Sequence, residues 1–341
     1  MIKRILALSG MTVAVALAQA PKPAPAKPAA AQAKPAAAKA AGKAVSNYTP
    51  PKTSWGEPDL QGTWPLDNLI SVGLERKAQN ANKAELSDAE IATAQAAMDK
   101  RNAAPKAAIP VADTSKKVLK QTSLIVDPPN GKFPALTERG KNLQSEMQSS
   151  YKPGKNSYDG IEDFSSWDHC ITRGMPVSME PRNYNNGLRI TQAPGYVIIL
   201  LEMAHEARVI PTTPIPKLDG AIKQYMGESR GHWEGNTLVV ETTNFNGLTG
   251  QTSAGVPSSP GPLQPETTNF KTVERFTRTG PDTLEFKMVV SDPEVMVSDY
   301  TVAYPLFLDN SYEMYEYACH EGNTAIRNYI ETSRFERHKP K

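Results

Sequence analysis

Acidic side chains are missing from the first 52 residues of this 341-residue chain, although these residues carry eight of its 38 lysines and arginines. Residues 53–341 therefore hold 30 basic against 36 acidic side chains, a formal net charge of −6. A body of this sign disfavours nucleic acid as a partner, because phosphate binding requires a basic surface. Beyond residue 20, no stretch approaches the roughly 18 apolar residues of a transmembrane helix, so we expect no stable membrane insertion.

Cysteine is scarce, and the only two, Cys170 and Cys319, each stand beside a histidine. In an oxidising compartment such a pair predicts a disulfide, whose loop of about 150 residues would stabilise the fold by ~5 kcal/mol in the chain-entropy model. The alternative is a Cys₂His₂ metal site with His169 and His320. Zinc ligands are usually spaced two to four residues apart, however, and neighbours on a strand point to opposite faces. We therefore favour the disulfide and expect no metal. With no nucleotide-binding glycine loop in the chain, we also expect no cofactor.

The N-terminus has the three parts of a cleavable secretory signal peptide, residues 1–20. Lys3 and Arg4 precede an apolar run from Ile5 to Leu17, and Ala18-Gln19-Ala20 forms an A-x-A cleavage site. The alternative is a membrane anchor that is not cleaved. Residues 21–52, mainly proline, alanine and lysine, predict a disordered tether. The expected location is the periplasm or the outside of the cell.

The pattern of the body changes along the chain. Residues 53–165 predict an irregular, partly helical N-terminal segment, with a helix over 88–101 behind the capping-box pair Ser87 and Glu90. Residues 166–341 predict a β domain that ends in a helix over 324–336. Turn signals such as Gly235-Asn236 and Gly280-Pro281-Asp282 separate the expected strands. These strands span 187–193, 196–203, 206–211, 231–234, 237–245, 272–278, 283–290, 298–306 and 313–318.

The fold class predicted from this order is mainly β. Parallel strands need crossover helices, and none intervenes here, so the strands predict an antiparallel meander. A meander of about eight strands commonly closes into a barrel, in this case of the calycin or lipocalin-like kind. An eight-stranded barrel can hold one small ligand in its lumen.

Several strings resemble a family of uncharacterised exported proteins of soil bacteria. They are WGEPDLQGTW from Trp55, SLIVDPP from Ser123, GESRGHWEGNTLVVETTNF from Gly227 and YACHEGN from Tyr317. The resemblance covers most of the body. It implies export but no activity, so it assigns no catalytic residue. The hairpin around Gly235 also resembles strand pairs of calycin-type barrels.

The candidate catalytic residues follow from the predicted bridge and from one strand end. The bridge would hold His169 and His320 close together, and the sheet would bring them to Glu202, His205 and Arg208. On a continuous strand Glu202 and Arg208 would share a face with Glu206. The candidate ligand-binding residues are Arg173, Tyr196, Arg230, His232, Trp233, Tyr317 and Glu321, because small-molecule sites combine apolar walls with a few polar groups.

Two main functions fit these features. The first is an exported β-barrel that binds a small, partly apolar or aromatic molecule. The alternative is a cofactor-independent lyase, isomerase or hydrolase that uses histidine as acid or base. Gly227-Glu228-Ser229-Arg230-Gly231 matches the nucleophile elbow of serine hydrolases, but a strand rather than a helix is expected after it. A purely structural envelope protein is a third possibility, and the sequence leaves the oligomeric state open.

Overall fold

The computed structural model describes residues 48–103, 116–150, 157–250, 255–256, 259–260 and 263–339. The predicted signal peptide and the tether up to residue 47 lie outside the described residues. Every described residue belongs to one compact unit, Ser46–Lys341. None of the helices in the described ranges is long and apolar enough to cross a membrane.

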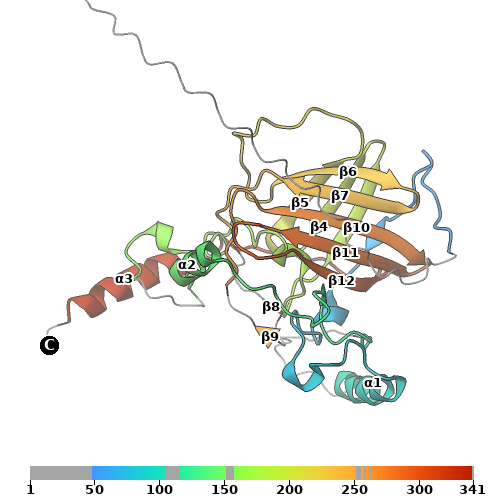
Figure 1. Ribbon diagram of the computed structural model, residues 1–341, viewed down its shortest axis with the longest axis horizontal. Coiled ribbons are helices and arrows are strands. Elements are labelled where there is room, and N and C mark those ends of the chain that lie inside the picture. The colour runs from blue at the N-terminus through green and yellow to red at the C-terminus, as the bar shows by residue number, and fades with distance from the viewer. Residues whose placement is uncertain are drawn as a thin grey trace, which may run out of the picture. The chain divides into compact units, whose positions relative to one another are not determined.

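Two antiparallel sheets form the centre of this unit (Figure 1). The four-stranded sheet has the order β1-β3-β4-β5, with β1 (Gly62–Thr63), β3 (Leu188–Ala193), β4 (Tyr196–Leu201) and β5 (Glu206–Pro211). The six-stranded sheet has the order β2-β12-β11-β10-β7-β6. Its strands are β2 (Ile125–Asp127), β6 (Glu228–Glu234), β7 (Thr237–Thr243), β10 (Lys271–Gly280), β11 (Thr283–Ser291) and β12 (Tyr300–Phe307). β8 (Gly255–Val256) and β9 (Ser259–Pro260) pair separately.

Alternation of apolar and polar residues builds the six-stranded sheet, as the sequence predicts. On β10 and β11 every second side chain is buried, and Phe276 and Phe286 face each other across the ladder. The hairpin turns predicted around Gly235-Asn236 and Gly280-Pro281-Asp282 join β6 to β7 and β10 to β11. β1 and β2 come from the irregular N-terminal segment, so that segment contributes one strand to each sheet.

The sheets face each other and large side chains fill the space between them. Trp64, Phe276, Phe286 and Tyr304 are fully or almost fully buried there. β5 and β6 approach closely. A Cβ added to Gly231 on β6 would lie 3.0 Å from Ile210 Cγ2 on β5. Among the described residues, however, no hydrogen-bonded ladder joins β5 to β6, and the strands pair as two antiparallel sheets.

The helices lie close to where the sequence places them. α1 spans Asp88–Ala103 behind the predicted capping box, in which the Ser87 amide donates to Glu90 Oε2 over 2.8 Å. α2 spans Glu138–Glu146, and its first turn is capped by Thr137. α3 spans Ala325–Arg337, behind Thr324. Short 3₁₀ turns span Asp67–Leu69, Ala78–Asn80, Ile161–Asp163, Val177–Met179 and Met203–His205.

The prediction of a strand over 313–318 is wrong. This segment has no ladder partner, and a buried carboxylate holds it instead. Glu202 accepts hydrogen bonds from the Tyr312 hydroxyl at 2.7 Å and from the Tyr315 amide at 2.9 Å. Side-chain contacts of this kind leave no period in the sequence, so the alternating tyrosines and glutamates of this stretch are misleading.

Candidate functional site

The predicted disulfide is confirmed. Cys170 and Cys319 are bonded across a sequence separation of 149 residues, with their Cα atoms 5.7 Å apart. Among the described residues, no group of three or more histidine, cysteine or acidic side chains could hold a metal ion. The bridge joins residues 169–173 to residues 317–321, and it lies beside a cluster of aromatic and basic side chains.

This cluster, the bridge cluster, consists of Trp167, Arg173, Tyr184, His205 and Tyr317. The Arg173 guanidinium lies 3.9 Å over the Trp167 ring, and Tyr317 packs 5.5 Å from Trp167 and parallel to Tyr184. His205 accepts the Tyr317 amide hydrogen bond at 2.8 Å through Nε2. The structure thus brings together three residues that the sequence predicts: Arg173, His205 and Tyr317.

The predicted common face of Glu202 and Arg208 is not formed, because the chain turns between them. Ala204 and His205 have φ values of 64° and 50°, and the turn reverses β4 into β5. Glu202 is 2% exposed and accepts four hydrogen bonds, from the Asn185 amide, the Gly187 backbone, the Tyr312 hydroxyl and the Tyr315 backbone. The carboxylate therefore holds the loop over residues 312–315 in place.

Arg208 lies in the interior and joins the two sheets. Its guanidinium forms a two-point ion pair with Glu274 on β10, whose side chain is fully buried. Burial, the largest single cause, would lower the pKa of Arg208, but the charge and hydrogen bonds of Glu274, together with the nearby Glu206 and Tyr304, raise it. Both charges are engaged, so Arg208 is a structural residue in this arrangement.

The other predicted residues are scattered. His169 Nε2 lies 3.0 Å from the Ile161 carbonyl oxygen, and His320 and Glu321 are exposed in the turn that follows Cys319. Tyr196 stands at the opposite end of β4 from Glu202, about 20 Å along the chain.

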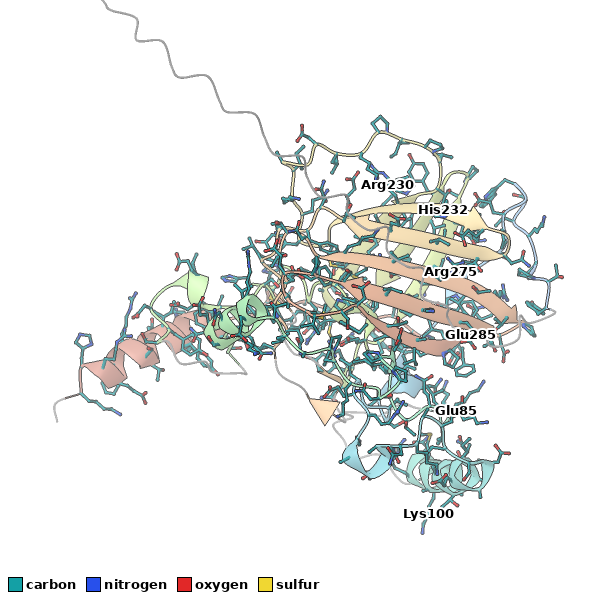
Figure 2. The ribbon with its side chains drawn as sticks, viewed as in Figure 1. Glu85, Lys100, Arg230, His232, Arg275 and Glu285 are labelled. Atoms are coloured by element: carbon teal, nitrogen blue, oxygen red, sulfur yellow. A yellow bond between two sulfur atoms is a disulfide. The ribbon has the colours of Figure 1, made fainter. Side chains whose placement is uncertain are left out.

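Arg230 and His232 lie on the outer face of β6, together with Arg275 on β10 and Glu285 on β11 (Figure 2). Trp233 alternates with His232, so it points inward and packs against the core. Arg230 donates to the Pro216 carbonyl oxygen and to Glu228. These three predicted ligand-binding residues therefore do not share a cavity with the bridge cluster.

A second buried carboxylate lies near Arg173. Glu180 is 2% exposed, and neither of its oxygens has a hydrogen-bond partner among the described residues. Burial raises its pKa to about 7, although Arg182, 3.6 Å away, acts in the opposite direction. The cavity beside it measures about 20 Å³, which is room for about one water molecule.

A larger hollow, the Glu266 pocket, has a volume of about 300 Å³. Four segments distant in sequence line it: the end of α2 with residues 147–148, residues 162–165, the loop 247–250, and residues 263–266. Gln144 at the end of α2 donates to the Leu263 carbonyl oxygen at 2.6 Å, which joins the first segment to the last. Gly250 has a φ of 43°, a backbone conformation that favours glycine, and an added Cβ would lie 2.6 Å from Met147 Cε.

Glu266 is the buried charge of this pocket. Its side chain is 7% exposed, and the Thr249 amide and hydroxyl both donate to Oε1. Oε2 has no hydrogen-bond partner among the described residues. Burial raises the pKa of Glu266 to about 7, the hydrogen bonds from Thr249 and Gly250 oppose this shift, and the nearby Asp292 adds to it.

Apolar side chains form much of the remaining wall. Phe164 and Leu263 are 7% and 5% exposed, whereas Leu248 stands at the rim with 65% of its surface exposed. A hollow with apolar walls and a buried, partly unpaired carboxylate has the composition of a small-molecule site. No protein-family model, curated protein or solved structure matches the chain. The pocket is therefore a candidate site on the evidence of its geometry alone.

Sequence reasoning misses Glu266, and no local signal marks it. Glu266 follows Pro265, outside every expected strand and helix, and its partner Thr249 is 17 residues away. The glycines Gly247 and Gly250, both with positive φ, are the only hint of a shaped loop.

Proposed function

We propose that this is an exported protein that binds a small, partly apolar molecule in the Glu266 pocket. One observation carries the proposal: a hollow of about 300 Å³ combines apolar walls with a buried carboxylate. Ligand pockets range from about 300 to 1,000 Å³ and are mostly apolar with a few polar groups.

The pocket replaces the barrel lumen as the place of binding. The space between the two sheets is filled by aromatic side chains and by the Arg208–Glu274 pair. The Glu266 pocket lies outside this filled interior, and loops rather than strands form its wall. Binding sites are often built from loops held on a rigid scaffold.

The export part of the proposal rests on two independent features. The first is the order of basic, apolar and small residues over 1–20. The second is the Cys170–Cys319 bridge, since structural disulfides persist in oxidising compartments. Secreted material that begins at or near Pro21 in mass spectrometry would support export, and an intact leader would count against it.

The catalytic alternative has less geometric support. Glu202 accepts four structural hydrogen bonds, Arg208 is paired with Glu274, and His205 is engaged by the backbone of Tyr317. His169, Arg230 and His232 lie on other surfaces. Among the described residues that line the Glu266 pocket, none is one of the predicted histidines.

A ligand screen tests the proposal. The chain from Pro21 onward is screened by thermal shift against small apolar and aromatic compounds, and binding is confirmed by calorimetry. Leu248→Ala should weaken binding about fivefold, because a partly covered leucine contributes roughly 1 kcal/mol to burial. Val297→Ala is the matched control, since Val297 is equally exposed at 65% but lies outside the pocket. Absence of any stabilising compound, or equal binding by both variants, would contradict the proposal.

A further inference from the structure

We propose that the loop over residues 213–224, which leads from β5 to β6 (Figure 1), docks on the surface of an anionic lipid bilayer without crossing it. This 213–224 loop holds the protein on the bilayer by shallow insertion of aliphatic side chains and by attraction of lysine to lipid phosphate. The inference is independent of the Glu266 pocket, to whose described lining the loop contributes no residue.

The first observation is that the loop exposes apolar side chains along its whole length. All twelve residues of the 213–224 loop are exposed, and among them Ile215, Leu218 and Ile222 are 38%, 40% and 51% exposed. Six isoleucine and leucine side chains are strongly exposed among the described residues, and these three are half of them. Exposed apolar groups that gather in one segment mark an interaction surface.

The second observation is that β6 anchors the loop at its base. The Leu218 amide donates to Glu228 Oε1 at 2.9 Å, and the Arg230 guanidinium donates to the Pro216 carbonyl oxygen at 2.8 Å. Glu228 is only 7% exposed, so the anchor belongs to the folded body. Pro214 and Pro216 further restrict the backbone of the loop. The sheet therefore presents the loop in a restricted conformation, which lowers the entropy lost on docking.

The third observation is the charge of the loop. It carries the exposed Lys217 and Lys223 against one acidic residue, Asp219, which accepts a hydrogen bond from the Ala221 amide. Residues 53–341 as a whole have a net charge of −6, so the loop is opposite in sign to the body that presents it. Lysine stems can lie along apolar surface while their ammonium groups reach lipid phosphate. Residues 21–52 add six lysines and no acidic side chain, which favours the same partner.

A protein partner fits these features less well than a lipid surface. A stable protein interface takes about 20–30 residues a side, and its strongest contacts are enriched in tryptophan, tyrosine and arginine. The 213–224 loop offers twelve residues, and none of them is aromatic or arginine. A bilayer requires no complementary shape, only apolar side chains that insert and basic groups that meet the phosphates.

Co-sedimentation of the chain from Pro21 onward with unilamellar vesicles tests the inference. Vesicles of phosphatidylglycerol should bind the protein, and vesicles of phosphatidylcholine should bind it at least about tenfold more weakly. Ile215→Ser, Leu218→Ser and Ile222→Ser together should weaken binding to phosphatidylglycerol about a hundredfold, from roughly fivefold for each partly exposed side chain. Circular dichroism checks that this triple variant is folded.

The matched control is a second triple variant outside the loop. Ile161→Ser, Ile171→Ser and Val297→Ser alter side chains that are 60%, 43% and 65% exposed, and together they should change vesicle binding by less than about twofold. Lys217→Gln with Lys223→Gln tests the charge, and it should weaken binding to phosphatidylglycerol about thirtyfold. This lysine variant decides the question if the serine variant of the loop does not fold.

Equal binding by the loop variants and the control variant would overturn the inference, because the six lysines of residues 21–52 would then account for the attraction. Failure of the unaltered chain to bind phosphatidylglycerol would also overturn it and would leave the loop to a protein partner. Equal binding to both kinds of vesicle would overturn it as well. The proposed function is tested separately, because a compound that binds the Glu266 pocket should bind the loop variants as it binds the unaltered chain.

Discussion

The buried pair Arg208–Glu274 offers a quantitative test of the two-sheet interior. Glu274→Gln leaves the Arg208 guanidinium buried without its countercharge, 3% exposed at the side chain. Removing one partner of a buried ion pair destabilises proteins by about 3–5 kcal/mol. For a unit of this size, that loss lowers the melting temperature by about 10 °C, given roughly 2–4 °C per kcal/mol.

The exposed ion pair between Arg275, the next residue on β10, and Glu234 provides the control. Arg275 points to the opposite face of β10 and pairs with Glu234 at 2.6 Å, with 39% and 49% of the two side chains exposed. Glu234→Gln should therefore change stability by less than about 1 kcal/mol, as exposed ion pairs do. Denaturant unfolding followed by circular dichroism measures both variants.

A double variant separates the missing charge from the change in packing. Arg208→Met with Glu274→Met removes both charges and should recover most of the stability lost in Glu274→Gln, since well-packed apolar residues often replace buried ion pairs without loss. Equal unfolding free energies for Glu274→Gln and Glu234→Gln would refute the reasoning, because the Arg208–Glu274 and Arg275–Glu234 pairs would then not differ in burial.

Two further predictions concern the bridge and the buried carboxyls. Cys170→Ser should lower the unfolding free energy by up to ~5 kcal/mol in the chain-entropy model, and denatured, unreduced protein should show no free thiol by reagent titration. Glu180 and Glu266 have pKa values raised from 4.5 to about 7, so the folded state binds more protons than the unfolded state between these values. Stability should therefore fall as pH rises from about 4.5 to above 7, by roughly 3 kcal/mol for each carboxyl. Glu180→Gln should make that decline smaller. Urea unfolding at pH 5 and at pH 8 gives the decline in unfolding free energy, and an equal decline in Glu180→Gln and in the unaltered chain would show that Glu180 is not buried.

Much of the sheet structure could be predicted because its cause is local. Alternation along β10 and β11, together with the turn residues around Gly235 and Gly280, defines hairpins without knowledge of distant contacts. The capping pair Ser87 and Glu90 marks the start of α1 for the same reason. Whether the two sheets close into a barrel does not follow from the sequence, because closure depends on how β5 meets β6 and on the side chains that fill the interior.

The candidate site shows the opposite balance. The disulfide could be predicted from two cysteines, and it led to part of the bridge cluster. The roles of Glu202 and Arg208 could not, because the turn at Ala204 sends their side chains to different partners, the 312–315 loop and Glu274. The Glu266 pocket depends on four segments that meet only in the folded chain, and none of them carries a recognisable motif.

The most direct test of the central claim is the position of a bound compound. A crystal structure of the chain from Pro21 onward, with the compound that stabilises it most in the thermal-shift screen, gives this position. The account predicts that the compound lies in the hollow lined by Phe164, Leu248 and Leu263. A compound bound elsewhere on the chain, or a screen in which no compound binds, would contradict the account.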